Sequence, residues 1–168
     1  SRYTGYSTIA VTQGKWYAEF KYVASSGGSD VMVGIGDLPE MENLNRQGSR
    51  FGLGGNSVAY YADSGDKYVG PSNTISSYGD SYTVNDIIGV ALDLDNGYVY
   101  FSKNGTFQNS GVPTSGSTGT GAIPLTDPAS TEYGVYFPSI NFVNGSYHAK
   151  FHLNMGLGFF GTTAVSSA

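Results

Sequence analysis

The chain has 168 residues and no cysteine, carries a formal net charge of −5, and contains 25 Gly and 14 Tyr. Its few, scattered Lys and Arg exclude a basic surface that binds the phosphate backbone of nucleic acids. The lack of cysteine excludes disulfides and thiolate metal sites. No apolar run approaches the about eighteen residues that cross a bilayer, so the sequence predicts one compact domain, residues 1–168, without membrane insertion.

The first half of the chain holds short apolar segments separated by Gly, Asp and Ser. Residues 16–22 alternate, with Trp16 and the other even positions apolar and Glu19 among the polar ones. A period of two predicts a strand with one buried face and places Glu19 on its polar side, as in an outer strand. Residues 31–35 form a continuous apolar run, which is typical of a strand covered on both sides. Weaker strands are predicted at residues 58–61, 68–69 and 81–84.

Two Asn-Gly pairs predict hairpins in the second half. An apolar run at residues 87–94 meets Asp95-Asn96-Gly97 and resumes at residues 98–101. Asn-Gly tolerates the positive φ values of a tight turn, so this segment is expected to form a β-hairpin. By the same reasoning, residues 136–143 and 146–153 are expected to pair across Asn144-Gly145.

Two long stretches lack a strand pattern. Residues 38–55 are expected to form an exposed connection, and residues 106–131 an irregular segment rich in Gly, Ser, Thr and Pro. A loop as long as the second one is usually either functional or disordered, and the sequence leaves both alternatives open. No segment has a sustained helical period with a cap, so helices should be short or absent. Many short strands predict an all-β fold, a two-layer antiparallel sandwich.

Several motifs occur in the order found in one known family. They are Gly14-Lys15-Trp16-Tyr17-Ala18-Glu19, Val33-Gly34-Ile35-Gly36-Asp37, Asp86-Ile87-Ile88-Gly89-Val90-Ala91-Leu92-Asp93, Phe101-Ser102-Lys103-Asn104-Gly105, Phe137-Pro138-Ser139-Ile140 and Asn154-Met155-Gly156. On these residues the chain resembles SPRY domains over about residues 14–156. The resemblance implies a bent, concanavalin A-like jelly-roll sandwich whose rim loops bind a partner. Residues 106–131 depart from the family pattern, in which this region is short.

The composition suggests a biological setting as well. A polar, Tyr-rich, cysteine-free chain also resembles the SPRY modules of structural proteins in tailed bacteriophages, such as tail fibres and capsid appendages. This second resemblance implies location in a virion, where the domain would contact another virion protein or the host surface.

Catalytic and metal chemistry find little support. His148 and His152 alternate with Lys150 along a predicted strand, so two solvated histidines are favoured over a zinc site. The Asp93 to Gly97 segment lacks the Gly and Glu of a calcium-binding EF-hand loop, and the turn interpretation is favoured. Glu19 and Glu132 have no motif that suggests a glycosidase pair. We therefore expect no enzyme activity, no cofactor and no metal.

Binding has better candidates among the loops. Tyrosine set among Ser and Gly supplies contact area at a small entropic cost, and Met and Arg make adaptable and forked contacts. The predicted partner-binding residues of the rim loops are Met41, Arg46, Arg50, Tyr61, Asp63, Lys67, Tyr68 and Tyr78. For the three tyrosines, packing within the sheets is an equally good interpretation. The long connection and the Tyr61 to Tyr68 turn are expected to converge on one rim.

The sequence thus predicts a binding module whose partner is a protein or a host-surface glycan. A lectin-like carbohydrate-binding domain is the main alternative, because exposed tyrosines can stack on sugars. A unit that binds copies of itself, as a possible homo-oligomer, is another.

Overall fold

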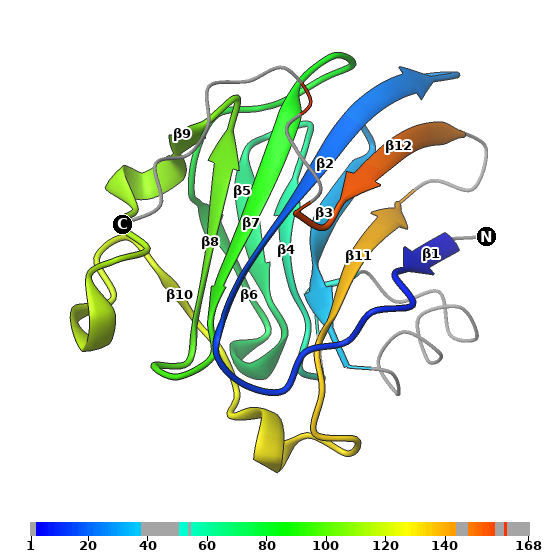
Figure 1. Cartoon of the computed structure of the whole chain (residues 1–168). Coiled ribbons are helices and arrows are strands. Elements are labelled where there is room, and N and C mark those ends of the chain that lie inside the picture. The colour runs from blue at the N-terminus through cyan, green and yellow to red at the C-terminus, as the bar shows by residue number, and fades with distance from the viewer. Residues whose placement is uncertain (1–2, 38–50, 54, 144–147, 157–159, 161–168) are drawn as a thin grey trace.

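A computed structural model describes residues 3–37, 51–53, 55–143, 148–156 and 160, and these form two antiparallel β-sheets that pack face to face (Figure 1). The first sheet has the spatial order β1 (Tyr3–Tyr6), β11 (Phe137–Phe142), β3 (Val31–Gly36), β4 (Val58–Tyr61), β5 (Asp66–Val69) and β6 (Thr74–Ser77). The second sheet has the order β10 (Ile123–Pro124), β8 (Tyr98–Lys103), β7 (Ile87–Asp93), β2 (Lys15–Ser25) and β12 (Ala149–Asn154), with β9 (Thr106–Phe107) paired to β8. The predicted all-β sandwich is confirmed.

Helices are reduced to single turns in the part of the chain that the structure describes. They are the 3₁₀ helices η1 (Gly70–Ser72), η2 (Gln108–Ser110), η3 (Gly116–Thr118) and η4 (Pro128–Ser130). None of these turns is long or apolar enough to cross a membrane.

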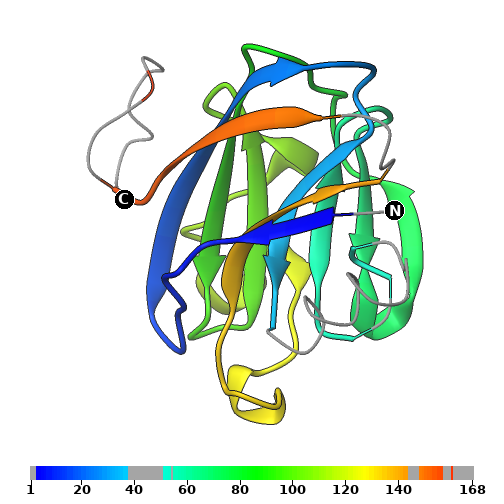
Figure 2. The same ribbon diagram turned by 90° about the vertical axis from the view of Figure 1, so that its right-hand side faces the viewer.

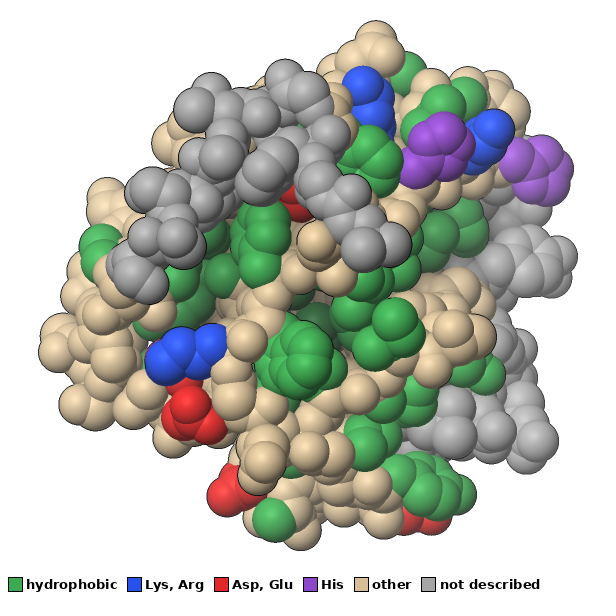
Figure 3. All heavy atoms as spheres, viewed as in Figure 1, with side chains coloured by type: hydrophobic (Ala, Val, Ile, Leu, Met, Phe, Trp, Pro, Cys, Tyr) green, Lys and Arg blue, Asp and Glu red, His purple; other side chains and the backbone are tan. Residues whose placement is uncertain are grey.

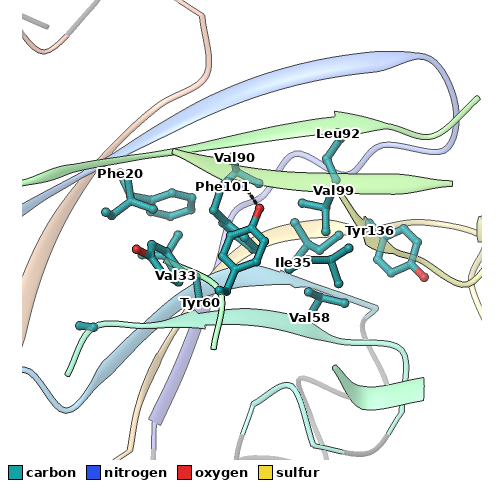
Figure 4. Packing of buried hydrophobic residues seen from close by; sticks show 14 of the residues in the cluster. Phe20, Val33, Ile35, Val58, Tyr60, Val90, Leu92, Val99, Phe101 and Tyr136 are labelled. Atoms are coloured by element: carbon teal, nitrogen blue, oxygen red, sulfur yellow. Dashed lines mark hydrogen bonds between the residues drawn. The ribbon is translucent and has the colours of Figure 1, made fainter. Parts of the chain in front are cut away.

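The main core lies between the sheets (Figure 4). Alternate residues of each strand point inward because side chains of a strand have a period of two. Phe20, Val90 and Phe101 come from the second sheet and meet Val33 and Tyr60 of the first. A smaller cluster lies on the outer face of the first sheet, and its buried members are Met32, Phe51, Ala59, Tyr68 and Val143. Strand β3 is therefore buried on both faces, as its continuous apolar run predicts.

The strand predictions are confirmed for β2, β3, β4, β5, β7 and β8 and wrong at one place. Residues 81–84 form no strand, whereas β6, which the sequence did not predict, occupies Thr74–Ser77. All four residues of β6 are exposed, so this edge strand shows no apolar alternation to detect. Tyr82, which lies in this predicted strand, belongs instead to a loop, and its side chain is buried.

Only one of the two predicted hairpins exists. Strands β7 and β8 pair across the Asp95 to Gly97 turn, as expected. The second hairpin is wrong, because β11 and β12 belong to different sheets. Both edges of β11 are already paired, with β1 and β3, and β12 pairs with β2 instead. Figure 2 shows β1 (dark blue) and β12 (orange) on the same side of the sandwich, each at the edge of its sheet.

Strand β2 departs from its predicted pattern at two residues. Trp16 is 48% exposed, because it lies at the start of the strand at the end of the sandwich, where its indole Nε1 donates to the Gln13 carbonyl at 2.7 Å. Glu19 is only 2% exposed. Strand β2 is an inner strand between β7 and β12, so the prediction of an outer strand with a solvated Glu19 is wrong.

The long segment at residues 106–131 is folded. It contains β9, η2, η3, β10 and η4, and it packs along β8. The Tyr98 hydroxyl donates to the Ser117 carbonyl at 3.2 Å, and Ile123 pairs with Val99. Of the two alternatives for this segment, disorder is therefore wrong.

Candidate binding rim

Four connections meet at one end of the sandwich, the upper end in Figure 1. They are residues 26–30, 62–65, 78–86 and 104–105, which join β2 to β3, β4 to β5, β6 to β7 and β8 to β9. Antiparallel neighbours exchange ends, so every second connection along each sheet returns to the same end. We call residues 26–30, 61–67, 78–86 and 103–106 the upper rim.

Backbone contacts lock the rim connections to one another. The Gly79 N–H donates to the Gly65 carbonyl at 3.0 Å, and the Tyr82 N–H donates to the Ala62 carbonyl at 2.9 Å. Gly65 has a φ of +75°, and a Cβ placed there would lie 2.1 Å from the Gly79 carbonyl oxygen. Glycine is thus required at this position for both its backbone conformation and the close approach.

Three tyrosines fasten the longest rim connection to the core. The Tyr82 hydroxyl donates to the Tyr60 carbonyl at 2.8 Å and accepts from the Val33 N–H at 3.1 Å. The Tyr78 hydroxyl accepts from the Phe101 N–H at 3.1 Å, and burial raises the pKa of Tyr78 to about 12. The Tyr60 hydroxyl donates to the Asp80 carbonyl. Because these bonds reach strands of both sheets, the rim is held in one arrangement before any partner arrives.

The inserted segment supports the rim from the side. Gln108, at the start of η2, is buried, and its side-chain carbonyl accepts from the Asp80 N–H at 2.8 Å. Its amide donates to the Thr106 carbonyl at 2.8 Å. The first turn of the segment therefore fixes the backbone of the β6–β7 connection, which is a structural role that the sequence did not reveal.

Acidic side chains dominate the rim. Its aspartates are Asp30, Asp63, Asp66, Asp80 and Asp86, and its lysines are Lys67 and Lys103. Lys103 Nζ donates to the Ser81 carbonyl at 2.7 Å and lies 3.6 Å from an Asp86 carboxylate oxygen, while Lys67 Nζ lies 5.7 Å from the centre of the Tyr78 ring. Asp63 and Asp80 are exposed. The rim thus presents excess negative charge on a rigid frame.

The structure divides the predicted rim residues into two groups. Asp63 is exposed at the β4–β5 turn, Lys67 is half-buried, and Tyr61 is half-buried with its hydroxyl donating to Asp30 Oδ1 at 2.7 Å. Partial burial and the Asp30 carboxylate raise the pKa of Tyr61. Tyr68 and Tyr78 are only 3% and 5% exposed, so their rings pack in the core and offer a partner little area.

The other predicted residues, Met41, Arg46 and Arg50, lie outside the described residues, and their role stays a prediction. The ends of their connection follow β3 and precede β4, at the end of the sandwich opposite to the upper rim. Phe51 and Leu53, also from this connection, pack with Tyr68 on the outer face of the first sheet.

Sequence reasoning missed Asp30, Asp80, Asp86 and Gln108. The three aspartates stand in connections and Gln108 in η2, and the positions of all four in space depend on strand pairing, so composition gives no signal for Asp30, Asp80 or Gln108. Asp86 is the exception, because it directly precedes the apolar run that became β7. A polar residue at the boundary of a predicted strand only weakly predicts a position at the end of the sandwich.

The candidate catalytic carboxylates do not form an acid pair at an open groove. Glu19 is buried, and its carboxylate accepts from the Tyr17 hydroxyl at 3.2 Å and from the Phe160 N–H at 3.4 Å. Burial raises the pKa of that Tyr17 phenol to about 12. Glu132 lies in the connection between η4 and β11. Across the described ranges, no group of three His, Cys, Asp or Glu side chains could hold a metal ion.

The Asp93 segment is a turn, as its sequence favours. The Asp93 carboxylate accepts from the Asn96 backbone N–H at 3.1 Å and side-chain Nδ2 at 2.9 Å, and it pairs with the Lys15 ammonium. Burial opposes the charged form, but the bonds from Lys15 and Asn96 prevail and hold the pKa of Asp93 below its ordinary value.

The comparison with known families agrees with this fold. The sequence model of the SPRY domain matches residues 15–126, which is more than half of the chain. The chain belongs to the SPRY domain family. The match includes the predicted opening strand, the central signature and most of the inserted segment, and the predicted family is confirmed.

Related proteins share part of this SPRY domain. Ran-binding protein 9 of Danio rerio is 34% identical over 97 residues, which is 58% of this chain and 15% of that protein. Ran-binding protein 9 of Homo sapiens is 35% identical over the same share of this chain, and ATP-dependent RNA helicase DDX1 of Xenopus laevis is 34% identical over 99 residues. The match with each of these three relatives spans only 12 to 15% of that relative's length.

A solved structure shows the same fold. The SPRY domain of human HERC1 superposes with a TM-score of 0.68, covers 93% of this chain and 84% of its own, and is 18% identical. SPRY domains are generally protein-interaction modules, and this chain is one by its family. Fold and family alone do not identify the partner.

Proposed function

We propose that this SPRY domain binds a protein partner at the upper rim and that the partner presents basic side chains there. The observation that carries the proposal is the set of five aspartates on three of the four interlocked rim segments, opposed by two lysines that already have partners. Complementary charge speeds association and selects the partner.

The rigidity of the rim supports the proposal. Tyr78 and Tyr82 bond the 78–86 connection to core strands, while Gly65 and Gln108 bond to Gly79 and Asp80 of the same connection. Little conformational freedom is therefore lost on binding. Asp63 and Asp80 stand exposed on this frame. Their carboxylates are therefore the first contacts for an approaching cation.

A charge-reversal experiment tests the proposal. The double variant Asp63→Lys/Asp80→Lys and the control Glu132→Lys, an exposed acid outside the rim, serve as baits against cell extract, with quantitative mass spectrometry of captured proteins. The wild type and the control are expected to capture the same basic-surfaced protein, and the double variant to lose it. Equal capture by all three baits would refute the rim as the binding surface.

The partner's identity is open to direct tests. Because two relatives are named for binding Ran, Ran is a reasonable purified bait for this domain. The bacteriophage setting and the virion location stay proposals, and the vertebrate relatives do not support them. Self-association is a further proposal, which a strictly monomeric sedimentation profile would contradict.

The structure removes the main support for a lectin-like function. It depended on exposed rim tyrosines that could stack on sugar rings, but Tyr68 and Tyr78 are buried and the Tyr61 hydroxyl is bonded to Asp30. Binding on a glycan array that disappears in Tyr61→Ala would restore it.

A further inference from the structure

Strand β12 is an edge strand at the side of the sandwich. It ends the second sheet and, among the described residues, pairs with β2 alone. It has six residues and no proline. An edge strand of this kind can accept a further strand from another chain.

The direction of the backbone hydrogen bonds alternates along β2, and this alternation shows which backbone groups of β12 face outward. The Tyr22 N–H donates to the Asp86 carbonyl at 3.0 Å, and the Tyr22 carbonyl accepts from the Asn85 N–H at 2.8 Å, so Tyr22 is bonded on the β7 side. Residues alternate along a strand, so Lys21 is bonded toward β12, where its partner is His152. Phe151 and Leu153 consequently direct their N–H and C=O groups to the free edge.

The side chains of β12 alternate in chemistry. Lys150 and His152 are exposed, and His152 is in register with Lys21 of β2. Phe151 stacks on Tyr22 with ring centres 4.6 Å apart, and Leu153 is 38% exposed. An added strand would therefore meet the Lys150 ammonium and the His152 imidazole on one face and apolar side chains on the other.

Lys150 and Lys21 give this edge positive charge, although the chain is acidic overall. Figure 3 shows both histidines, with Lys or Arg side chains beside them, over β12 and its neighbour at the upper right. The nearby carboxylate on β2, Glu19, is buried and bonded to Tyr17 and Phe160. The exposed charge here is thus complementary to an acidic ligand.

We propose that β12 accepts an extended segment of another protein as an additional strand, and that this segment alternates acidic and apolar residues. A second copy of this chain fits less well. Pairing β12 with β12 would bring Lys150 of both copies onto one face, and like charges on paired strands destabilise a sheet. Nucleic acid would leave the apolar side of the strand unused.

Synthetic peptides test the proposal on the full chain. A labelled peptide of alternating Glu and Val is the probe, and its Lys-for-Glu version, a copy N-methylated at alternate residues and a single-stranded oligonucleotide are controls. Fluorescence anisotropy is expected to show binding of the Glu–Val peptide alone. Amide exchange is expected to slow at Phe151 and Leu153 when that peptide is added, because their N–H groups become bonded.

Two variants separate the backbone from the charge. Leu153→Pro removes an outward N–H without breaking the β2 ladder, since proline is tolerated on the open side of an edge strand, and it is expected to abolish binding. Lys150→Glu/His152→Glu changes only exposed side chains, so it keeps the test valid if the proline variant does not fold. This double variant is expected to lower the affinity for the Glu–Val peptide at least about tenfold and to bind the Lys–Val peptide more tightly than the Glu–Val peptide.

Three results would overturn the proposal. They are equal binding of the N-methylated peptide, oligonucleotide binding as tight as that of the Glu–Val peptide, and unchanged exchange at Phe151 and Leu153 in the saturated complex. Since Asp63 and Asp80 lie on the rim and not on β12, their charge reversal should leave peptide binding unaltered. The rim proposal and the β12 proposal can therefore be refuted independently of each other.

Discussion

Replacing Gly65 with alanine tests how firmly the rim connections are locked. Gly65 has a φ of +75°, and its added Cβ would lie 2.1 Å from the Gly79 carbonyl oxygen. Gly116 is a matched control, because it also has a positive φ, +58°, but has nothing within 4 Å of the added Cβ. Both variants carry the left-handed backbone strain, and only Gly65→Ala adds a clash.

The expected losses follow from these contacts. Left-handed strain costs about 1–2 kcal/mol for a residue other than glycine, and this is the whole expected effect of Gly116→Ala. Gly65→Ala must also push the β6–β7 connection away, which overpacks the rim and weakens the bond from the Gly79 N–H to Gly65. The expected destabilisation is then about 3–6 kcal/mol.

Urea denaturation followed by circular dichroism measures both free energies of unfolding. The midpoint of Gly65→Ala should fall well below that of Gly116→Ala at a similar slope. Amide exchange should quicken at Gly79 in the first variant only. Equal losses in the two variants would refute the locked rim and, with it, the preorganisation on which the proposed function relies.

Two further predictions concern the core and the β7–β8 turn. Tyr82→Phe should destabilise the domain by about 1–3 kcal/mol, because the buried Val33 N–H loses its acceptor. Tyr61→Phe, at a half-buried site, should cost about 1 kcal/mol or less in the same urea denaturation, and the opposite order would contradict the assigned hydrogen bonds. Asp93→Asn should destabilise the domain at pH 7. Because the folded-state pKa of Asp93 is lowered, its stabilisation is fully present above about pH 4 and is lost as the pH falls through that lowered value, so the stability difference between wild type and variant should shrink in acid. A pH-independent difference would argue against the Lys15 pairing.

Local sequence signals determined the fold class and several strands. The alternation in β2, the apolar run of β3 and the Asn96-Gly97 turn act over a few neighbouring residues, so they can be recognised without knowing what lies beside them. The same holds for the family motifs, which are continuous stretches of sequence. The acidic excess and the absence of cysteine also limit the possible chemistry, because both are properties of composition and do not depend on how the chain folds.

Tertiary structure decided what the connections do. Asn144-Gly145 suggests a hairpin, yet β11 and β12 lie in different sheets because β1 and β3 already occupy both edges of β11. Tyr68 and Tyr78 stand among polar neighbours in sequence, but strand pairing and the 78–86 connection turn their rings inward. Burial and the meeting of loops depend on contacts between distant residues, so the acidic rim and the basic edge of β12 became visible only in three dimensions.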